Sequence, residues 1–233
     1  MKPTPQPHLN KEQLQKIKKI IKENSPNKAP VKIIAVTKKH SIEKIKEASK
    51  NDLLIIGENK IQETEKKFLK NKSIRKKIEL HLIGHLQSNK VKKAVKIFDV
   101  IQTVDSKKIL KKINSAAATI NKQQRIYFQI NIGKDEKKKG FTVFSLIREC
   151  KKIKEYKNIK AEGIMTILPQ GKTKIKNKKM FKETVLLQKT IQKKLISSCV
   201  NTSMGMSEDY LEAVKAGATH IRIGSALFGK RKQ

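Results

Sequence analysis

The sequence has little of what would mark several common classes of protein. Cysteine occurs only at Cys150 and Cys199, with no CxxC pair and no histidine at ligand spacing, which argues against a disulfide framework or a zinc site. No apolar run approaches the length of a membrane-spanning helix, and the first residues, MKPTPQPHLNKEQ, lack the apolar stretch of a signal peptide. We therefore expect a cytoplasmic protein with no metal site and no membrane contact.

Acidic and aromatic residues are also scarce. Asp and Glu number 20 against 55 Lys and Arg, a net charge of +35, and five of the basic residues are arginines, which leaves 50 lysines. Such a surface attracts polyanions without specificity, but net charge informs association and solubility rather than fold. Aromatic residues make up 4% of the chain and tryptophan is absent, so platforms for stacking nucleic-acid bases are few. Polyanion binding is the weakest function considered, and we expect no specific nucleic-acid partner.

Short apolar runs alternate with lysine-rich segments of helical spacing along the whole chain. Eight of these runs have the length and composition of buried parallel strands. They cover residues 31–37, 53–57, 79–84, 100–104, 126–132, 161–167, 198–203 and 220–224. Eight strands alternating with helices predict a (β/α)8 TIM barrel, as a single domain over residues 1–233, with an open doubly wound sheet as the rival architecture.

Helix signals support this alternation. Asn10 followed by Gln13 is typical of a capping box, which predicts an extra N-terminal helix that stops before Ser25. We expect Ser207 to cap the helix after the seventh strand, with Glu208 and Asp209 in its first turn. The apolar stripes of three predicted helices are Leu14, Ile17, Ile20 and Ile21; Val91, Ala94, Val95 and Phe98 after Ser88; and Ile109, Leu110 and Ile113 after Ser106.

Lys38 stands where the first predicted strand ends. Function in such barrels lies at the C-terminal ends of the strands, and the run VKIIAVT leads directly into Lys38, Lys39 and His40. A lysine at the barrel mouth can be desolvated and lose its proton readily, as a Schiff-base amine requires. An ordinary surface lysine is the alternative in a chain this rich in lysine.

Polar residues also follow the other predicted strands. Each is weak evidence alone, because Asn and Ser also cap helices and His is often a core residue. Their shared position at the strand ends nevertheless indicates a site there. After the second to sixth strands they are Glu58, Asn59, His81, His85, Gln87, Ser88, Asn89, Gln129, Asn131 and Thr166.

The last two strands lead into SMGMSED and RIGSALFG. Loops after the seventh and eighth strands form the usual phosphate site of these barrels, together with a helix N-terminus. Gly205 and Gly224 would let the backbone approach a phosphate, and Ser203 and Ser225 would add hydroxyl donors.

Arg222 lies in the middle of the last apolar run, where a buried strand has no obvious use for an arginine. A lysine at one end of a ligand, a phosphate site at the other and an arginine between them describe a site for pyridoxal 5′-phosphate (PLP), with Arg222 facing the pyridine nitrogen. The charge of Arg222 would disfavour protonation of that nitrogen, so carbanion chemistry should be muted. The residues therefore predict PLP bound covalently to Lys38.

The chain also resembles a known family. Seven motifs carry the resemblance, in order across residues 10–230: AVTKKHS (35–41), IIGENKIQE (55–63), HLIGHLQSNK (81–90), QINIGKDEKKKGF (129–141), EGIMTI (162–167), SMGMSEDYLEA (203–213) and IRIGSALFG (221–229). They are similar to the pyridoxal phosphate homeostasis proteins of the YggS/PROSC type. The resemblance implies a fold-type III PLP barrel, similar to the N-terminal domain of alanine racemase.

The family's functional residues can be transferred only where the motifs match. Many members read serine, lysine, threonine, lysine, proline where this chain has residues 37–41, so His40 replaces a second lysine. If that lysine passes PLP to acceptors, Lys39 is the available substitute. The resemblance implies a Schiff base on Lys38, a ring-nitrogen contact by Arg222, phosphate contacts by Ser203, Gly224 and Ser225, and a place near the cofactor for Asn59.

The implied function is PLP binding in intracellular vitamin B6 homeostasis, with PLP-dependent apo-enzymes as acceptors and no catalytic residues. The alternative is an amino-acid racemase, which needs a second acid/base opposite the lysine. In alanine racemase this group is a tyrosine of the partner subunit, supported by an extra β domain. Only Tyr127, Tyr156 and Tyr210 are present here, and 233 residues leave no room for that domain. We expect a monomer or weak dimer.

Overall fold

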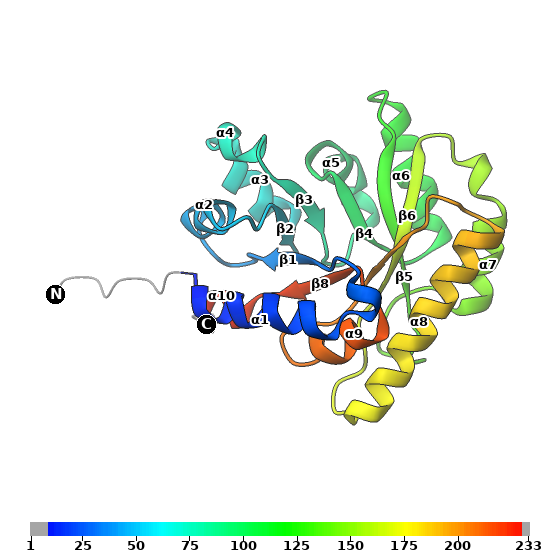
Figure 1. Cartoon of the computed structure of the whole chain (residues 1–233). Coiled ribbons are helices and arrows are strands. Elements are labelled where there is room, and N and C mark those ends of the chain that lie inside the picture. Colours follow the sequence, from blue (N-terminus) through cyan, green and yellow to red (C-terminus); the bar gives the residue numbers. More distant parts are fainter. Residues whose placement is uncertain (1–8, 230–233) are drawn as a thin grey trace.

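The computed structural model describes residues 9–229. Their strands are all parallel and close into a barrel in chain order, with β8 paired to β1 (Figure 1). Closure through these two strands confirms the predicted (β/α)8 barrel and excludes the open sheet. The strands are β1 (Lys32–Val36), β2 (Ile55–Glu58), β3 (Glu79–Leu82), β4 (Val100–Val104), β5 (Gln124–Ile130), β6 (Ile159–Thr166), β7 (Asn201–Ser203) and β8 (His220–Ile223).

Helices connect successive strands and surround the barrel (Figure 1). Within residues 9–229 no helix combines the length and the apolar character needed to cross a bilayer. The α-helices are α1 (Lys11–Asn24), α2 (Ile42–Lys50), α3 (Ile61–Leu69), α4 (Lys72–Arg75), α5 (Val91–Ile97), α6 (Lys107–Ala118), α7 (Val143–Lys151), α8 (Lys174–Lys194), α9 (Tyr210–Ala216) and α10 (Ser225–Phe228). The described residues also form the 3-10 turns η1 (Pro26–Lys28), η2 (Ser88–Lys90) and η3 (Ile153–Glu155).

Alternate residues of each strand face the helices and the barrel interior. In β1, Ile33 and Ala35 belong to the large apolar core shared with the helices. Ile34 pairs in register with Arg222 of β8, on the other side of the strand. The apolar cluster inside the barrel is small and consists of Val100, Tyr127 and Met165, with Ile167 packed against it. Polar side chains lie against this cluster, because the rings of His81 and His220 are 6.4 and 5.9 Å from the ring of Tyr127.

The predicted N-terminal helix is α1. Asn10 Oδ1 accepts the backbone N–H of Gln13 at 2.8 Å, and the helix ends at Asn24, directly before Ser25. Leu14 and Ile17 are buried, and α1 packs against α9 and α10 beside β8 (Figure 1). The extra helix therefore covers the part of the barrel where the last strand meets the first.

The other two predicted apolar stripes are also confirmed. All seven residues are buried: Val91, Ala94 and Val95 in α5, Phe98 directly after it, and Ile109, Leu110 and Ile113 in α6. Strand boundaries differ more. β5 and β6 begin two residues earlier than expected, and β7 begins only at Asn201.

The prediction that Ser207 caps a helix is wrong. The helix α9 starts at Tyr210, so Glu208 and Asp209 precede it. Asp209 accepts the N–H of Met206 at 2.6 Å, and this carboxylate closes the turn in place of a serine cap.

Candidate functional site

Four neighbouring strands of the closed barrel, β7, β8, β1 and β2, carry the predicted cofactor residues at their C-terminal ends. Because β1 is the first strand and β8 the last, only barrel closure brings the two halves of this group together. Val36 pairs with Gly57 on one side, and β8 lies on the other. The residues are Lys38, Asn59, Ser203, Arg222, Gly224 and Ser225.

Lys38 stands in the turn that leaves β1. The amide of Thr37 still pairs with the carbonyl of Gly57 at 3.1 Å, so the strand pairing continues up to the residue before Lys38. Lys38 is half-buried, whereas Lys39 is exposed and has a φ of 61°. This left-handed conformation is costly for a non-glycine residue and persists only where the surroundings impose it.

Charged side chains of α3 hold the peptide groups on both sides of Lys38. Lys67 Nζ donates to the carbonyl oxygen of Thr37 at 2.9 Å, and the amide of Lys39 donates to Glu63 Oε1 at 2.6 Å. Lys67 and Glu63 are themselves 2.7 Å apart. Hydrogen bonds to charged groups are about twice as strong as neutral ones. They account for the left-handed turn and fix the backbone that carries the predicted cofactor lysine.

Glu58, the last residue of β2, completes this group. Its Oε1 accepts from Thr37 Oγ1 and from Lys67 Nζ, both at 2.7 Å. Its side chain is fully buried, and no described residue bonds to its Oε2. Burial raises the pKa of Glu58, although the charge of Lys67 opposes this shift. We call Glu58, Glu63 and Lys67 the clamp, since they act together on the turn of Lys38.

Asn59 follows the clamp glutamate and lies against the loop after β3. A Cβ built on Gly84 would be 2.2 Å from the carbonyl oxygen of Asn59 and 2.6 Å from its Cα. Thr103 Oγ1 donates to the carbonyl of Gly84 at 2.8 Å and fixes this loop from the side of β4. Glycine at position 84 is therefore required for the backbone of Asn59 to lie where it does.

The substitution Gly84→Ala tests this close approach. We expect it to lower the free energy of unfolding by about 2 kcal/mol, measured by chemical denaturation, because the clash is with backbone and not with a movable side chain. Gly171→Ala is the control, since nothing lies within 4 Å of its Cβ position and its cost comes from its φ of 72° alone. A loss no larger than that of the control would contradict the contact.

Arg222 is almost fully buried inside the barrel, at 4% exposure. Its NH1 donates to Ser203 Oγ at 2.9 Å and its NH2 to the carbonyl of Thr166 at 2.8 Å. Burial lowers the pKa of Arg222 to about 10, with Asp209 opposing the shift, so the guanidinium stays charged at neutral pH. A buried cation is thus held in a fixed orientation one strand away from the turn of Lys38.

The turns after β7 and β8 lie against each other. Gly205 has a φ of 84°, and a Cβ there would meet the Cβ of Ala213 at 2.6 Å. The carbonyl of Gly205 accepts the N–H of Arg222 at 3.0 Å, which ties the two turns together. Gly224 packs against Val36, whereas Ser225 is exposed. Both glycines thus lie where a side chain would meet a neighbour, Ala213 for Gly205 and Val36 for Gly224.

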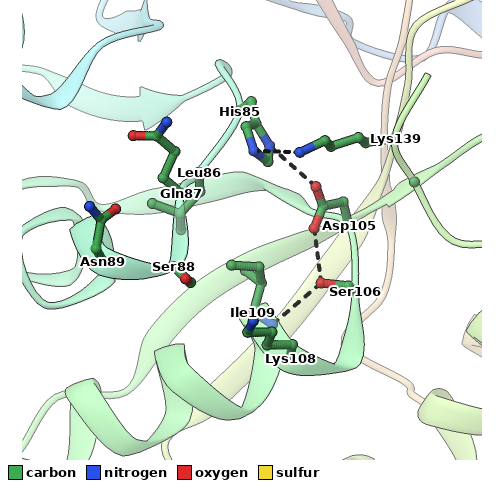
Figure 2. A pocket seen from close by; sticks show the side chains of 11 residues that line it. His85, Leu86, Gln87, Ser88, Asn89, Asp105, Ser106, Lys108, Ile109 and Lys139 are labelled. Atoms are coloured by element: carbon green, nitrogen blue, oxygen red, sulfur yellow. Dashed lines mark hydrogen bonds and ion pairs between the residues drawn. The ribbon is translucent and has the colours of Figure 1, made fainter. Parts of the chain in front are cut away.

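Two hollows open on the rim of the barrel. One, of about 570 Å³, lies between the loops after β3, β4 and β5, and Figure 2 shows its lining. The other, of about 380 Å³, lies over the ends of β3 to β6. Both are lined by His85 and Lys139, and neither by Lys38 or Arg222. In the larger one, His85 lies 3.3 Å from Asp105 and 2.9 Å from Lys139 Nζ (Figure 2). His85 is therefore engaged on both ring nitrogens.

Two of the predicted polar residues at the mouth shape a loop. Gln129 donates to the carbonyl of Lys139 at 2.8 Å. Asn131 donates to the carbonyls of Asp135 and Lys138 at 2.8 and 3.1 Å and accepts the N–H of Asp135. These amides hold the segment that brings Lys139 to the rim.

The structure also shows where His40, which departs from the family pattern, and the three tyrosines lie. The ring of His40 packs on Phe228 of α10, with centroids 5.4 Å apart. Tyr127 lies deep inside the barrel, 5.9 Å from the ring of His220, and burial raises its pKa. Tyr156 donates to Glu149, and Tyr210 begins α9. Neither Tyr127 nor Tyr156 is at the strand ends where a second acid/base would act.

Several residues behind the site were not singled out by sequence reasoning. Gln102 stands in the middle of β4, VIQTV, which is the same signal of a polar residue within an apolar strand that pointed to Arg222. Glu63 lies within the motif IIGENKIQE. Lys67 carries no signal, because nothing in the sequence separates it from the 50 lysines. Among the described residues no group of three or more His, Cys, Asp or Glu is placed to hold a metal ion.

Comparisons with known proteins agree with this geometry. Residues 10–232 match the alanine racemase N-terminal domain. A pyridoxal phosphate homeostasis protein of Synechocystis is 38% identical over 201 residues, which cover 86% of this chain and 92% of the relative. PipY of Synechococcus elongatus, solved with PLP bound, is 30% identical, with a TM-score of 0.84 over 94% of this chain and 99% of PipY.

A more distant likeness shows the fold alone. Alanine racemase of Clostridium difficile is 15% identical, with a TM-score of 0.71 over 94% of this chain and 56% of the racemase chain. The barrel is thus shared with a racemase, whereas full-length similarity is to homeostasis proteins. This chain belongs to the pyridoxal phosphate homeostasis protein family, built on the fold of the alanine racemase N-terminal domain.

Proposed function

We propose that this protein binds PLP covalently through Lys38 and serves in intracellular PLP homeostasis as a carrier without catalytic turnover. The observation that carries the proposal is the pairing of β8 with β1, which sets the buried guanidinium of Arg222 one strand from the turn of Lys38. The names of its relatives and the PLP bound to PipY support the same function. PLP supplies an aldehyde that forms a Schiff base with a primary amine.

The residues fit this cofactor. Lys38 offers the amine on a backbone held by the clamp, and Asn59 follows the neighbouring strand β2. Gly224 and the exposed hydroxyl of Ser225 follow β8, where the usual phosphate site of these barrels lies. Arg222 would face the pyridine nitrogen as a permanent cation and keep that nitrogen unprotonated.

A carrier role follows from the same electrostatics. A pyridine nitrogen kept unprotonated is a poor electron sink, so the site favours holding the cofactor over transforming amino acids. We propose PLP-dependent apo-enzymes as the acceptors and a monomer or weak dimer as the functional state. Lys39 is the exposed amine next to Lys38, and we propose that it takes the place of the second lysine that His40 replaces.

Mapping the covalent adduct tests the proposal. The purified protein is incubated with PLP, reduced with borohydride and analysed by visible absorption and peptide mass mapping. We expect an absorption band that is lost on reduction, with a stable adduct on the peptide containing Lys38. Adducts spread evenly over the surface lysines would contradict the site. Steady turnover of D- or L-alanine that is lost in Lys38→Ala would instead favour the racemase.

A further inference from the structure

Lys44, in α2, is the one buried lysine among residues 9–229, with an exposure of 6%. Lysine is almost never buried unless its ammonium group is paired, because removing that charge from water is costly. Here Nζ donates to the carbonyl oxygen of Phe228 at 3.3 Å and lies 5.9 Å from the centroid of the Phe228 ring. The buried cation is therefore bound to the last residue of α10.

Contacts from α1, α2 and the turn after β1 hold the C-terminal end of α10. The last carbonyl groups of a helix have no partner within it and need one from outside. In α10 the carbonyl of Leu227 accepts the N–H of Asn10, the N-cap residue of α1, at 2.9 Å, and the carbonyl of Phe228 accepts from Lys44. The ring of Phe228 is buried and packs on the ring of His40, with centroids 5.4 Å apart. This end of α10 is thus fixed by both backbone and side-chain contacts.

α10 is bonded directly to the turn after β8, where the phosphate of PLP is expected. The helix has only four residues. The N–H groups of Leu227 and Phe228 both donate to the carbonyl of Gly224 at 2.9 Å, and the N–H of Gly229 donates to the carbonyl of Ser225 at 2.9 Å. Because Phe228 bonds to Gly224, a displacement of the C-terminal end of α10 also displaces this turn.

The same contacts reach the turn of Lys38. The N–H of His40 donates to the carbonyl of Thr37 at 3.0 Å and closes this turn, so the ring that packs on α10 belongs to it. In addition, a Cβ built on Gly224 would lie 3.3 Å from the Cβ of Val36, the last residue of β1. The turn of the predicted Schiff-base lysine and the turn predicted to bind the phosphate are therefore fixed relative to each other.

We call Lys44, His40 and Phe228 the anchor. We propose that the anchor sets the position of the turn after β8, and that Lys44 and His40 are positioning residues for the phosphate of PLP that act through Phe228. This proposal rests on the proposed function. A cofactor joined to Lys38 at one end and held by its phosphate at the other binds best when both turns are already in place. His40 departs from the family pattern, so its part in the anchor is a feature of this chain.

Comparison of PLP with pyridoxal, which lacks the phosphate, tests this role. Pyridoxal senses Lys38 and Arg222 but not the turn after β8. We expect Lys44→Met to raise the Kd of PLP about tenfold relative to wild type and to change the Kd of pyridoxal less than about twofold. Lys44→Arg, which can donate to the same carbonyl, should keep most of the affinity for PLP. Equal weakening of both ligands by Lys44→Met would mean that the barrel is loosened as a whole, and the proposal would be wrong.

His40→Ala tests the anchor without changing the charge of Lys44. It removes the ring from Phe228 and keeps the backbone N–H that bonds to Thr37. We expect the Kd of PLP to rise about threefold and the Kd of pyridoxal to stay at the wild-type value. His40 is only half-buried, so this variant decides the question even where Lys44→Met does not fold. Unchanged PLP binding in His40→Ala would contradict the anchor, because Lys44 would then act through its charge alone.

Lys46→Met is the matched control for charge. Lys46 lies two residues after Lys44 on the same helix and is exposed, so the substitution removes the same unit of charge without touching α10. Both Kd values should stay within about twofold of wild type. Equal weakening of PLP binding by Lys46→Met and Lys44→Met would show that only the net positive charge matters, and would exclude the anchor.

Amide hydrogen exchange of the protein without PLP provides a readout independent of the cofactor. The N–H groups of Leu227 and Phe228 should exchange about tenfold faster in Lys44→Met than in wild type or Lys46→Met, because α10 opens more readily. Unchanged exchange would show that Lys44 does not hold α10. If the wild type binds PLP and the anchor variants bind it equally well, only this proposal fails. If the wild type binds neither PLP nor pyridoxal, the proposed function fails as well.

Discussion

Lys38→Ala should abolish the borohydride-stable adduct and raise the Kd of PLP by about 100-fold, close to 3 kcal/mol. The covalent bond is lost, while contacts by Arg222 and by the turn of Gly224 and Ser225 remain. Lys38 is half-buried at the end of a strand, and the clamp bonds to the peptide groups on both sides of it, which Lys38→Ala keeps. The variant should therefore fold normally. Mass mapping and fluorescence titration with PLP measure the two effects.

Lys39→Ala is the control for this result. It removes an adjacent exposed lysine, keeps the backbone N–H that bonds to Glu63, and leaves the predicted cofactor amine intact. Its adduct should remain on Lys38 at the wild-type level. An adduct of undiminished yield in Lys38→Ala, at Lys39 or elsewhere, would show that the covalent site has been misassigned.

Lys67→Met should lower the free energy of unfolding by about 3 kcal/mol at neutral pH. The change leaves the carboxyl group of Glu58 fully buried without its cation, and removal of one partner of a buried ion pair costs about 3–5 kcal/mol. The variant also releases the carbonyl of Thr37 beside Lys38. We therefore expect weaker PLP binding together with lower stability, measured by titration and by denaturation.

The loss should depend on pH. Burial raises the pKa of Glu58 in the folded state, and removal of Lys67 raises it further. A carboxyl group with a raised folded pKa binds its proton more tightly in the folded protein, so its penalty is full above the folded pKa. The penalty shrinks as the pH falls through that value toward the unfolded one, by up to about 1.4 kcal/mol per pH unit. Lys67→Met should therefore differ less from wild type in acid than at neutral pH.

The double variant Glu58→Gln/Lys67→Met provides the control, because a neutral amide needs no cation. It should recover much of the lost stability and show no pH dependence from position 58. PLP binding should stay weak, since Lys67 no longer holds the carbonyl of Thr37. A single variant as stable as wild type at every pH would show that Glu58 does not depend on Lys67.

The fold could be predicted from local patterns because each strand and helix carries its own signal. Apolar runs alternate with helical stripes, and side-chain caps such as Ser106 confirm where helices begin. The misplaced cap at Ser207 shows the limit of this reasoning. Whether Ser207 or Asp209 closes this turn depends on the path of the backbone, which cannot be derived from residue spacing.

The sequence by itself determined the barrel and pointed to Lys38 and Arg222, because a charged residue next to or within a buried strand stands out against its apolar neighbours. Only the tertiary structure decided what surrounds them. Lys67 resembles every other lysine until α3 packs beside β1, and Ser203 meets Gln102 only across the closed barrel. Hydrogen-bond partners 101 positions apart in the chain, as these two are, leave no local trace because the barrel's geometry, not sequence spacing, brings them together.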